Sequence, residues 1–202
     1  MSSLAVLAAT AGSSLPAYAA VTVIGYLVGA VSPAALLARR AGVDLRRAGS
    51  GNPGATNAGR VLGRRAGIGV AVADVAKGAL PAAGFALAGP ALGLLAGLAA
   101  VVGHVTSPFL RGRGGKGVAT AAGAVLGSHP RWAPFVIATW LLVLLLSRWV
   151  ALASVSAALS LVAVAVAVGA STPSLLWALG LAGIVTFRHR GNLARWWVRR
   201  QG

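Results

Sequence analysis

The chain of 202 residues has no cysteine, no glutamate and only two aspartates, Asp44 and Asp74. Without cysteine it can form no disulfide and carry out no thiol chemistry. Two aspartates leave paired-carboxylate catalysis almost nothing to draw on, and a site for a hard cation would need at least one of them. The three histidines are scattered along the sequence. A His/Cys metal cluster, or any metal site, is therefore not expected.

Apolar residues, by contrast, are abundant. Hydrophobic residues make up 57% of the chain, and the mean hydropathy is +0.82. These values are typical of a protein with several membrane-spanning helices. The net charge of +16 also occurs in nucleic-acid-binding proteins. In a chain this apolar, the charge favours basic cytoplasmic loops that face anionic lipid heads and an anionic substrate. We expect contact with membrane lipid and no nucleic-acid partner.

Seven apolar runs predict an all-α integral membrane protein with one domain over residues 1–202. They cover residues 17–38, 66–89, 90–108, 117–127, 132–147, 149–168 and 173–187. The first run contains Ser32 and Pro33, which a membrane helix tolerates where neighbouring groups satisfy the freed backbone. The fourth run is well short of the roughly 20 residues that a helix needs to cross. It is either a thin span or a re-entrant segment.

The distribution of positive charge favours crossing. If residues 117–127 cross, sixteen of the eighteen Lys and Arg lie on the side of Ser50, Lys77 lies within a span, and only Arg131 lies opposite. If this segment is re-entrant, the five arginines of the C-terminal segment move outside. Cytoplasmic loops carry the excess of Lys and Arg. The prediction is therefore seven spans, one of them short, with the amino end outside and the carboxyl end cytoplasmic.

The first polar loop contains the stretch from Ser50 to Asn57, which reads SGNPGATN. Its glycines permit close backbone approach, Pro53 stiffens it, and Ser, Thr and Asn supply neutral hydrogen-bonding groups. No carboxylate lies inside it, and arginines flank it on both sides. The stretch is typical of an anion-binding loop, although a polar turn between two helices has the same composition.

Two further polar segments lie on the same side of the predicted membrane. Residues 112–117 read GRGGKG at the start of the short fourth run, where glycine N–H groups and cations can cradle a phosphate. Residues 188–192 read RHRGN, and in a helix His189 and Asn192 share a face. Membrane-facing basic loops would account for either segment alone. Within the second apolar run, Asp74 and Lys77 stand at i and i+3, so they can form an interior ion pair.

Together these segments resemble the three signature motifs of the bacterial membrane glycerol-3-phosphate acyltransferases that use acyl phosphate, the PlsY family. Ser50 to Arg60 is similar to the first motif, Gly103-His104 with Gly114 to Gly117 to the second, and Arg188-His189-x-x-Asn192-x-x-Arg195 to the third. The stretches around Asp74 and from Arg148 to Ser154 are similar to the family as well. The resemblance spans nearly the whole chain.

Some positions depart from the family pattern. Gly29 to Pro33 reads GAVSP where the family commonly has GSIP, so we assign no substrate role to Ala30 or Ser32. Thr106-Ser107 replaces an aromatic–proline pair. The glutamate that often follows the third motif is missing, which affects the expected anchoring of the C-terminal segment more than the chemistry.

The resemblance implies transfer of an acyl group from acyl phosphate to the sn-1 hydroxyl of glycerol 3-phosphate, which gives lysophosphatidate (1-acyl-glycerol 3-phosphate) and phosphate. This is the first acylation step of phospholipid synthesis. Acyl phosphate is already an activated anhydride, so no cofactor is expected. The implied partners are both substrates, membrane lipid and the soluble enzyme that makes acyl phosphate. The implied location is the bacterial cell membrane, with the site facing the cytoplasm.

The motifs also supply the candidate site residues. The candidate catalytic residues are Ser50, Arg60, Lys116, His189 and Asn192. The candidate substrate- and phosphate-binding residues are Asn52, Thr56, Asn57, His104, Gly114, Gly115, Gly117, Ser154, Arg188 and Arg195. The proton of the attacking hydroxyl passes to His189 or to a substrate phosphate oxygen, with a slight preference for the phosphate. The alternative function is a membrane transporter or binding protein for a small organic phosphate. Such transporters usually show inverted repeats with paired broken helices, which this sequence lacks.

Overall fold

The computed structural model describes the backbone of residues 3–201 and the side chains of residues 15–194. This part of the chain is helical and contains no strand, so the expected all-α fold is confirmed. The elements are α1 (Ser3–Ala30), α2 (Pro33–Arg40), α3 (Ala55–Val61), α4 (Arg64–Ala86), α5 (Pro90–Thr106), the 3₁₀ turn η1 (Pro108–Leu110), α6 (Val118–Ser128), α7 (Ala133–Ser147), α8 (Val150–Ala167) and α9 (Thr172–Gln201).

All seven predicted apolar runs are helical. By length and composition, four segments are suited to crossing a membrane: Leu15–Arg40, Arg64–Ala86, Pro90–Leu110 and Val150–Ala167. The helices α6 and α7 are apolar but shorter. The number of spans and the sides of the two termini stay predictions.

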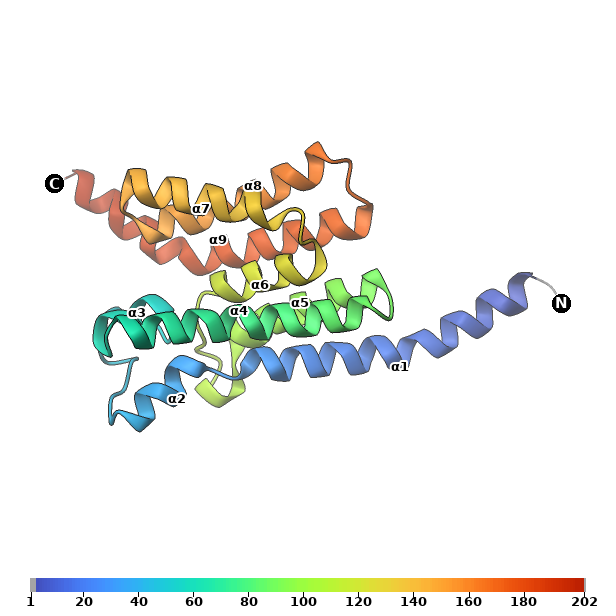
Figure 1. Ribbon diagram of the computed structural model, residues 1–202, viewed down its shortest axis with the longest axis horizontal. Coiled ribbons are helices and arrows are strands. Elements are labelled where there is room, and N and C mark those ends of the chain that lie inside the picture. Colours follow the sequence, from blue (N-terminus) through green and yellow to red (C-terminus); the bar gives the residue numbers. More distant parts are fainter. Residues whose placement is uncertain (1–2, 202) are drawn as a thin grey trace.

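The short helix α6 lies between two groups of helices. In Figure 1, α7, α8 and α9 lie on one side of it, and α1, α4 and α5 lie on the other. The helix α4 packs against α5 and α6, α1 runs along α5, and α8 contacts both α7 and α9. A smaller core, which includes Leu45, Ala58 and Val70, fastens α2, α3 and the loop between them to α4.

Close backbone contact holds α6 against α4. A Cβ atom added to Gly78 would collide with the carbonyl oxygen of Thr120, and one added to Gly123 would collide with that of Val75. Small residues allow membrane helices to approach in this way, because lipid provides no hydrophobic force between them. The contact places the start of α6, and the polar loop before it, at a defined position beside α4.

The first apolar run, predicted as one span over residues 17–38, lies within the single candidate span Leu15–Arg40, but it is not one continuous helix. It breaks between Ala30 and Pro33, where the Oγ of Ser32 caps α2 by accepting from the N–H of Ala35 at 3.3 Å. The freed carbonyl of Ala30 accepts from the Oγ of Ser107 at 2.6 Å. That of Val31 accepts from the Nζ of Lys77 at 2.7 Å. Side chains of neighbouring helices thus satisfy the backbone at the break.

The first polar loop, between the predicted runs over residues 17–38 and 66–89, also needs correction, because α3 forms inside it. Thr56, Asn57 and Arg60 therefore stand on a helix.

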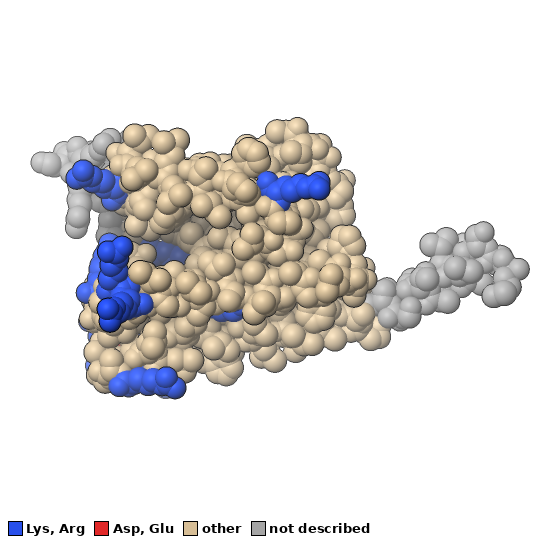
Figure 2. All heavy atoms as spheres, viewed as in Figure 1, with Lys and Arg blue, Asp and Glu red and all other residues tan. Residues whose placement is uncertain are grey.

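Basic side chains gather at one end of the molecule. In the view of Figure 2, most Lys and Arg lie at the end where α2 and α3 lie, and the long sides carry little charge. Many large apolar side chains are exposed, among them Leu80, Leu145 and Leu146. An apolar surface of this kind suits contact with lipid.

Candidate active site

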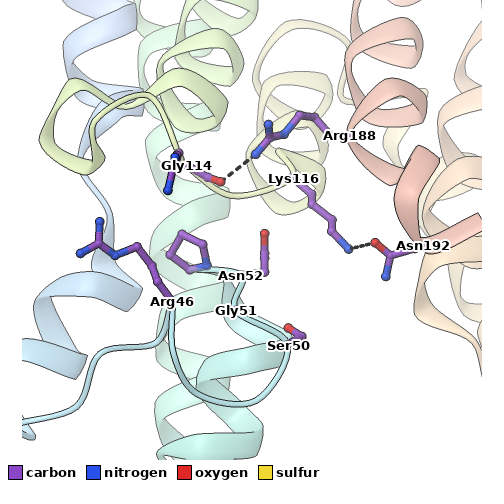
Figure 3. Close-up of a pocket in the computed structure, with 10 residues that line it drawn as sticks. Arg46, Ser50, Gly51, Asn52, Gly114, Lys116, Arg188 and Asn192 are labelled. Atoms are coloured by element: carbon purple, nitrogen blue, oxygen red, sulfur yellow. Dashed lines mark hydrogen bonds between the residues drawn. The ribbon is translucent and has the colours of Figure 1, made fainter. Parts of the chain in front are cut away.

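A cavity of about 350 Å³ lies where three segments far apart in the sequence meet (Figure 3). Its lining consists of Arg46, Ser50, Gly51, Asn52, Pro53, Arg113, Gly114, Lys116, Arg188 and Asn192. The structure thus brings together side chains from all three predicted motifs. Four lining residues are cations and none is a carboxylate, so the cavity is suited to an anion.

Asn57 shapes the first wall of the cavity. Its side chain is 1% exposed. Its Oδ1 accepts from the N–H of Ser50 at 2.7 Å, and its Nδ2 donates to the carbonyls of Leu45 and Ala48 at 3.1 and 2.9 Å. Gly49 has φ of +61°, and a Cβ there would collide with the Oδ1 of Asn57. The loop is therefore folded around this amide.

Asp44 helps to place Arg46 at the rim of the same wall. The carboxylate accepts from the backbone N–H of Arg46 at 3.0 Å and from its Nε at 3.3 Å. These bonds, led by the one from the backbone N–H, lower the pKa of Asp44 below its ordinary value. Because Asp44 stays ionised at neutral pH, it remains an acceptor for the Arg46 guanidinium.

The second wall is the glycine loop before α6. The N–H of Gly114 donates to the carbonyl of Val105, and that of Gly115 to the carbonyl of His104, both at 3.2 Å. Arg188 joins the loop from α9: its Nη2 donates to the carbonyls of Gly114 and Gly115 at 2.9 and 3.0 Å. The predicted use of these two glycine N–H groups as a phosphate cradle stays a prediction, because a substrate would have to share donors that the chain already pairs.

Lys116 links the second wall to the third. Its Nζ donates to the Oδ1 of Asn192 at 2.6 Å (Figure 3). The segment from Arg188 to Asn192 is helical, as the shared face of His189 and Asn192 required. An ammonium, a guanidinium and an amide from two elements therefore converge on one cavity.

Several predicted site residues lie elsewhere. Thr56 and Arg60 are exposed on α3 and do not line the cavity. His189 is buried, with Nδ1 2.8 Å from the carbonyl oxygen of Val185. Ser154 is buried on α8, where its Oγ accepts from the Nε1 of Trp140 at 3.3 Å.

Gly117 is the residue before α6, with φ of +82°. The side chain of Arg195 lies outside the described residues. The substrate roles predicted for all these residues stay predictions.

Sequence reasoning did not select two arginines that line the cavity, Arg46 and Arg113. Their position beside the two anion-binding motifs was the available signal. Among the described side chains, no group of three or more His, Cys, Asp or Glu could hold a metal ion.

The predicted ion pair inside the protein is confirmed. The Nζ of Lys77 lies 2.8 Å from the Oδ1 of Asp74. The Nδ1 of His104 lies 3.5 Å from the same oxygen. All three side chains are buried, and His104 lies behind the glycine loop, outside the lining of the cavity. His104 was not predicted to lie beside this ion pair, because 30 residues separate it from Asp74 in the sequence.

The fold and the cavity define a class: a helical integral membrane protein with a cation-lined pocket at one end. The profile of the glycerol-3-phosphate acyltransferase family matches residues 19–199. The glycerol-3-phosphate acyltransferase of Geotalea daltonii is 40% identical over 87% of this chain and 92% of its own. The glycerol-3-phosphate acyltransferase of Geobacillus kaustophilus is 42% identical over 88% of this chain and 91% of its own length.

The fold agrees with the sequence comparison. The crystal structure of PlsY (YgiH), an integral membrane glycerol 3-phosphate acyltransferase, in its glycerol 3-phosphate form matches with a TM-score of 0.88. The two chains are 36% identical, and the match covers 91% of this chain and 94% of the other. The chain therefore belongs to the glycerol-3-phosphate acyltransferase family, in its PlsY branch.

Proposed function

We propose that this enzyme transfers an acyl group from acyl phosphate to the sn-1 hydroxyl of glycerol 3-phosphate. The observation that carries the proposal is the cavity lined by four cations and no carboxylate. Both substrates carry a phosphate, and guanidinium and ammonium groups bind phosphate through charge-assisted hydrogen bonds. The related PlsY has been solved in a glycerol 3-phosphate form and in a lysophosphatidic acid form, which supports the same acceptor and product here.

In the proposed reaction, the C1 hydroxyl oxygen attacks the acyl carbon and forms the ester bond. The bond from the acyl carbon to the phosphate oxygen breaks, and its electron pair leaves with the phosphate. Lys116, Arg113 and Arg188 stabilise the negative charge on the two phosphates. Ser50, Asn52 and Asn192 hydrogen-bond and orient the acceptor. Arg60, predicted from the motif, would have to reach the substrates from its exposed position on α3.

The proton of the hydroxyl passes to a phosphate oxygen of the substrates in this proposal. His189, the other candidate base, is 2% exposed and does not line the cavity. A general base needs to come within hydrogen-bond reach of the proton it takes. The phosphate oxygens meet that condition because they enter the cavity with the substrate.

The proposed orientation places the cavity on the cytoplasmic face of a bacterial cell membrane. It follows from the gathering of basic side chains at the end that holds the cavity (Figure 2). On that side the cavity can receive acyl phosphate from a soluble enzyme.

The test is acyl transfer by the purified protein with labelled glycerol 3-phosphate and no added metal. Acyl phosphate, acyl-CoA and the acylated form of acyl carrier protein are compared as donors. We expect lysophosphatidate from acyl phosphate only. Lys116→Ala should lower the rate by at least about 100-fold, since it removes one preorganised cation from the developing charge. Equal turnover with acyl-CoA would refute the donor, and full activity of the Lys116→Ala variant would refute the assigned cavity.

A further inference from the structure

We infer that Asp74, through Lys77 and His104, is a positioning residue that holds two walls of the cavity in register. The inference rests on the proposed function, since it assigns the network to the glycerol 3-phosphate pocket. Asp74 lies on α4 with a side chain only 3% exposed. A carboxylate so deeply buried in a membrane protein is costly unless it is paired, and such groups are usually functional.

One arm of the network runs from Asp74 to the break between α1 and α2. Lys77 pairs with Asp74 at 2.8 Å and donates to the carbonyl of Val31 at 2.7 Å. The helix α2, which starts directly after this break, leads into the loop that carries Ser50. The ion pair therefore sets where the first wall of the cavity begins relative to α4.

The other arm runs from Asp74 to the glycine loop. The Nδ1 of His104 lies 3.5 Å from Asp74 Oδ1, and it has no hydrogen-bond partner among the described residues. The opposite edge of the imidazole faces the loop closely, because a Cβ on Gly115 would collide with His104 Nε2. The carbonyl of His104 accepts from the N–H of Gly115. The imidazole thus lies between Asp74 and the glycine loop, and its contact with Asp74 limits where the ring, and with it Gly115, can lie.

Two cations that line the cavity are linked to Gly115. Arg188 donates to the carbonyls of Gly114 and Gly115, and Lys116 follows directly in the chain and bonds Asn192. A shift of the imidazole would move this loop and both cations together. Neither Asp74 nor His104 lines the cavity. They act on the cavity by positioning the groups that do.

Two variants test the inference, because Asp74→Asn alone leaves Lys77 as a buried unpaired charge and is expected to prevent folding. The first variant, His104→Gln, removes the ring and keeps a polar side chain. The second, Asp74→Asn with Lys77→Met, removes both charges and keeps the side-chain volumes similar. Ser160→Ala is the control, since this hydroxyl donates within α8 to the carbonyl of Ala157 and Ser160 does not line the cavity. Each is assayed for KM and kcat with glycerol 3-phosphate.

A rise in KM for glycerol 3-phosphate of about 10- to 100-fold is expected in both test variants, because misplacement of binding groups by about 1 Å has effects of this size. The control should keep the unaltered KM. Loss of folded protein lowers the apparent kcat but not the KM of the molecules that remain folded. An unchanged KM in either test variant would therefore overturn the inference. A third variant combines His104→Gln with Asp74→Asn and Lys77→Met. If its rise in KM equals the product of the rises in the two test variants, the inference is also overturned, because substitutions within one network are not expected to be additive in free energy.

Hydrogen–deuterium exchange at residues 111–117 separates this inference from the proposed function. We expect faster exchange at Gly114 and Gly115 in both test variants, whether or not the protein transfers acyl groups. If the unaltered protein transfers no acyl group but exchange accelerates in the variants, the proposed function fails and the positioning role stands. If transfer proceeds as proposed and exchange is unchanged, the positioning role fails alone.

Discussion

At the scale of single residues, Asn57 shows that a motif position can shape a loop, while its predicted substrate role stays a prediction. The motif grouped it with the candidate substrate-binding residues. The structure buries it and uses both ends of its amide on Ser50, Leu45 and Ala48. A sequence motif records that an amide is needed at a position. It does not record whether the amide bonds the chain or a substrate.

Asn57→Ala should destabilise the first loop by about 1–3 kcal/mol, because one N–H and two carbonyls lose their partner. The expected result is a lower unfolding temperature in detergent and a lower rate of acyl transfer. Arg64→Ala, an exposed position at the start of α4, is the control and should leave the unfolding temperature unchanged. An unfolding temperature for Asn57→Ala equal to that of the control would contradict the role assigned to this amide.

At the scale of helices, the apolar runs predicted where most of the long helices lie, because a membrane helix must be apolar over its length. The predicted run over residues 149–168 corresponds to α8, Val150–Ala167, and the run over residues 132–147 to α7, Ala133–Ser147. The break at Val31 and the formation of α3 were not predicted. The break depends on Lys77 and Ser107, which are distant in sequence, and α3 packs on α4, the next helix along the chain.

The contact between α4 and α6 gives a prediction with a matched control on one helix. Gly78→Ala places a methyl group against the carbonyl of Thr120, and overpacking of this kind costs about 1–3 kcal/mol. Gly69→Ala, also on α4, meets no atom within 4 Å and should stabilise the helix by up to about 1 kcal/mol. Thermal unfolding in detergent measures both. A similar shift for the two variants would refute the close contact.

At the scale of the whole molecule, the asymmetry of charge predicts how the protein sits in the membrane. The basic end with the cavity is expected in the cytoplasm, and Arg131, at the turn between α6 and α7, outside. The chain has no cysteine, so any introduced thiol is a unique label. This property makes the orientation directly measurable.

Arg131→Cys should react with a membrane-impermeant maleimide in intact cells. Arg65→Cys, at the start of α4, should react only after the membrane is opened. Acyl transfer by each variant serves as a check that the labelled protein is folded. Labelling of Arg65→Cys in intact cells, or none of Arg131→Cys, would refute the orientation. The same labelling behaviour at both positions would refute the predicted crossing of the short helix α6.

The sequence by itself determined the features that depend on composition and on close spacing. These are the membrane class, the helical segments, the Asp74–Lys77 pair one turn apart, and the three motifs whose resemblance pointed to the family. Only the tertiary structure decided which groups reach the cavity. It placed Arg46 and Arg113 in the lining, left Arg60 outside, paired the glycine N–H groups within the chain, and brought His104 to Asp74. Helix periodicity relates residues three or four apart, whereas contacts between distant segments depend on how whole helices pack.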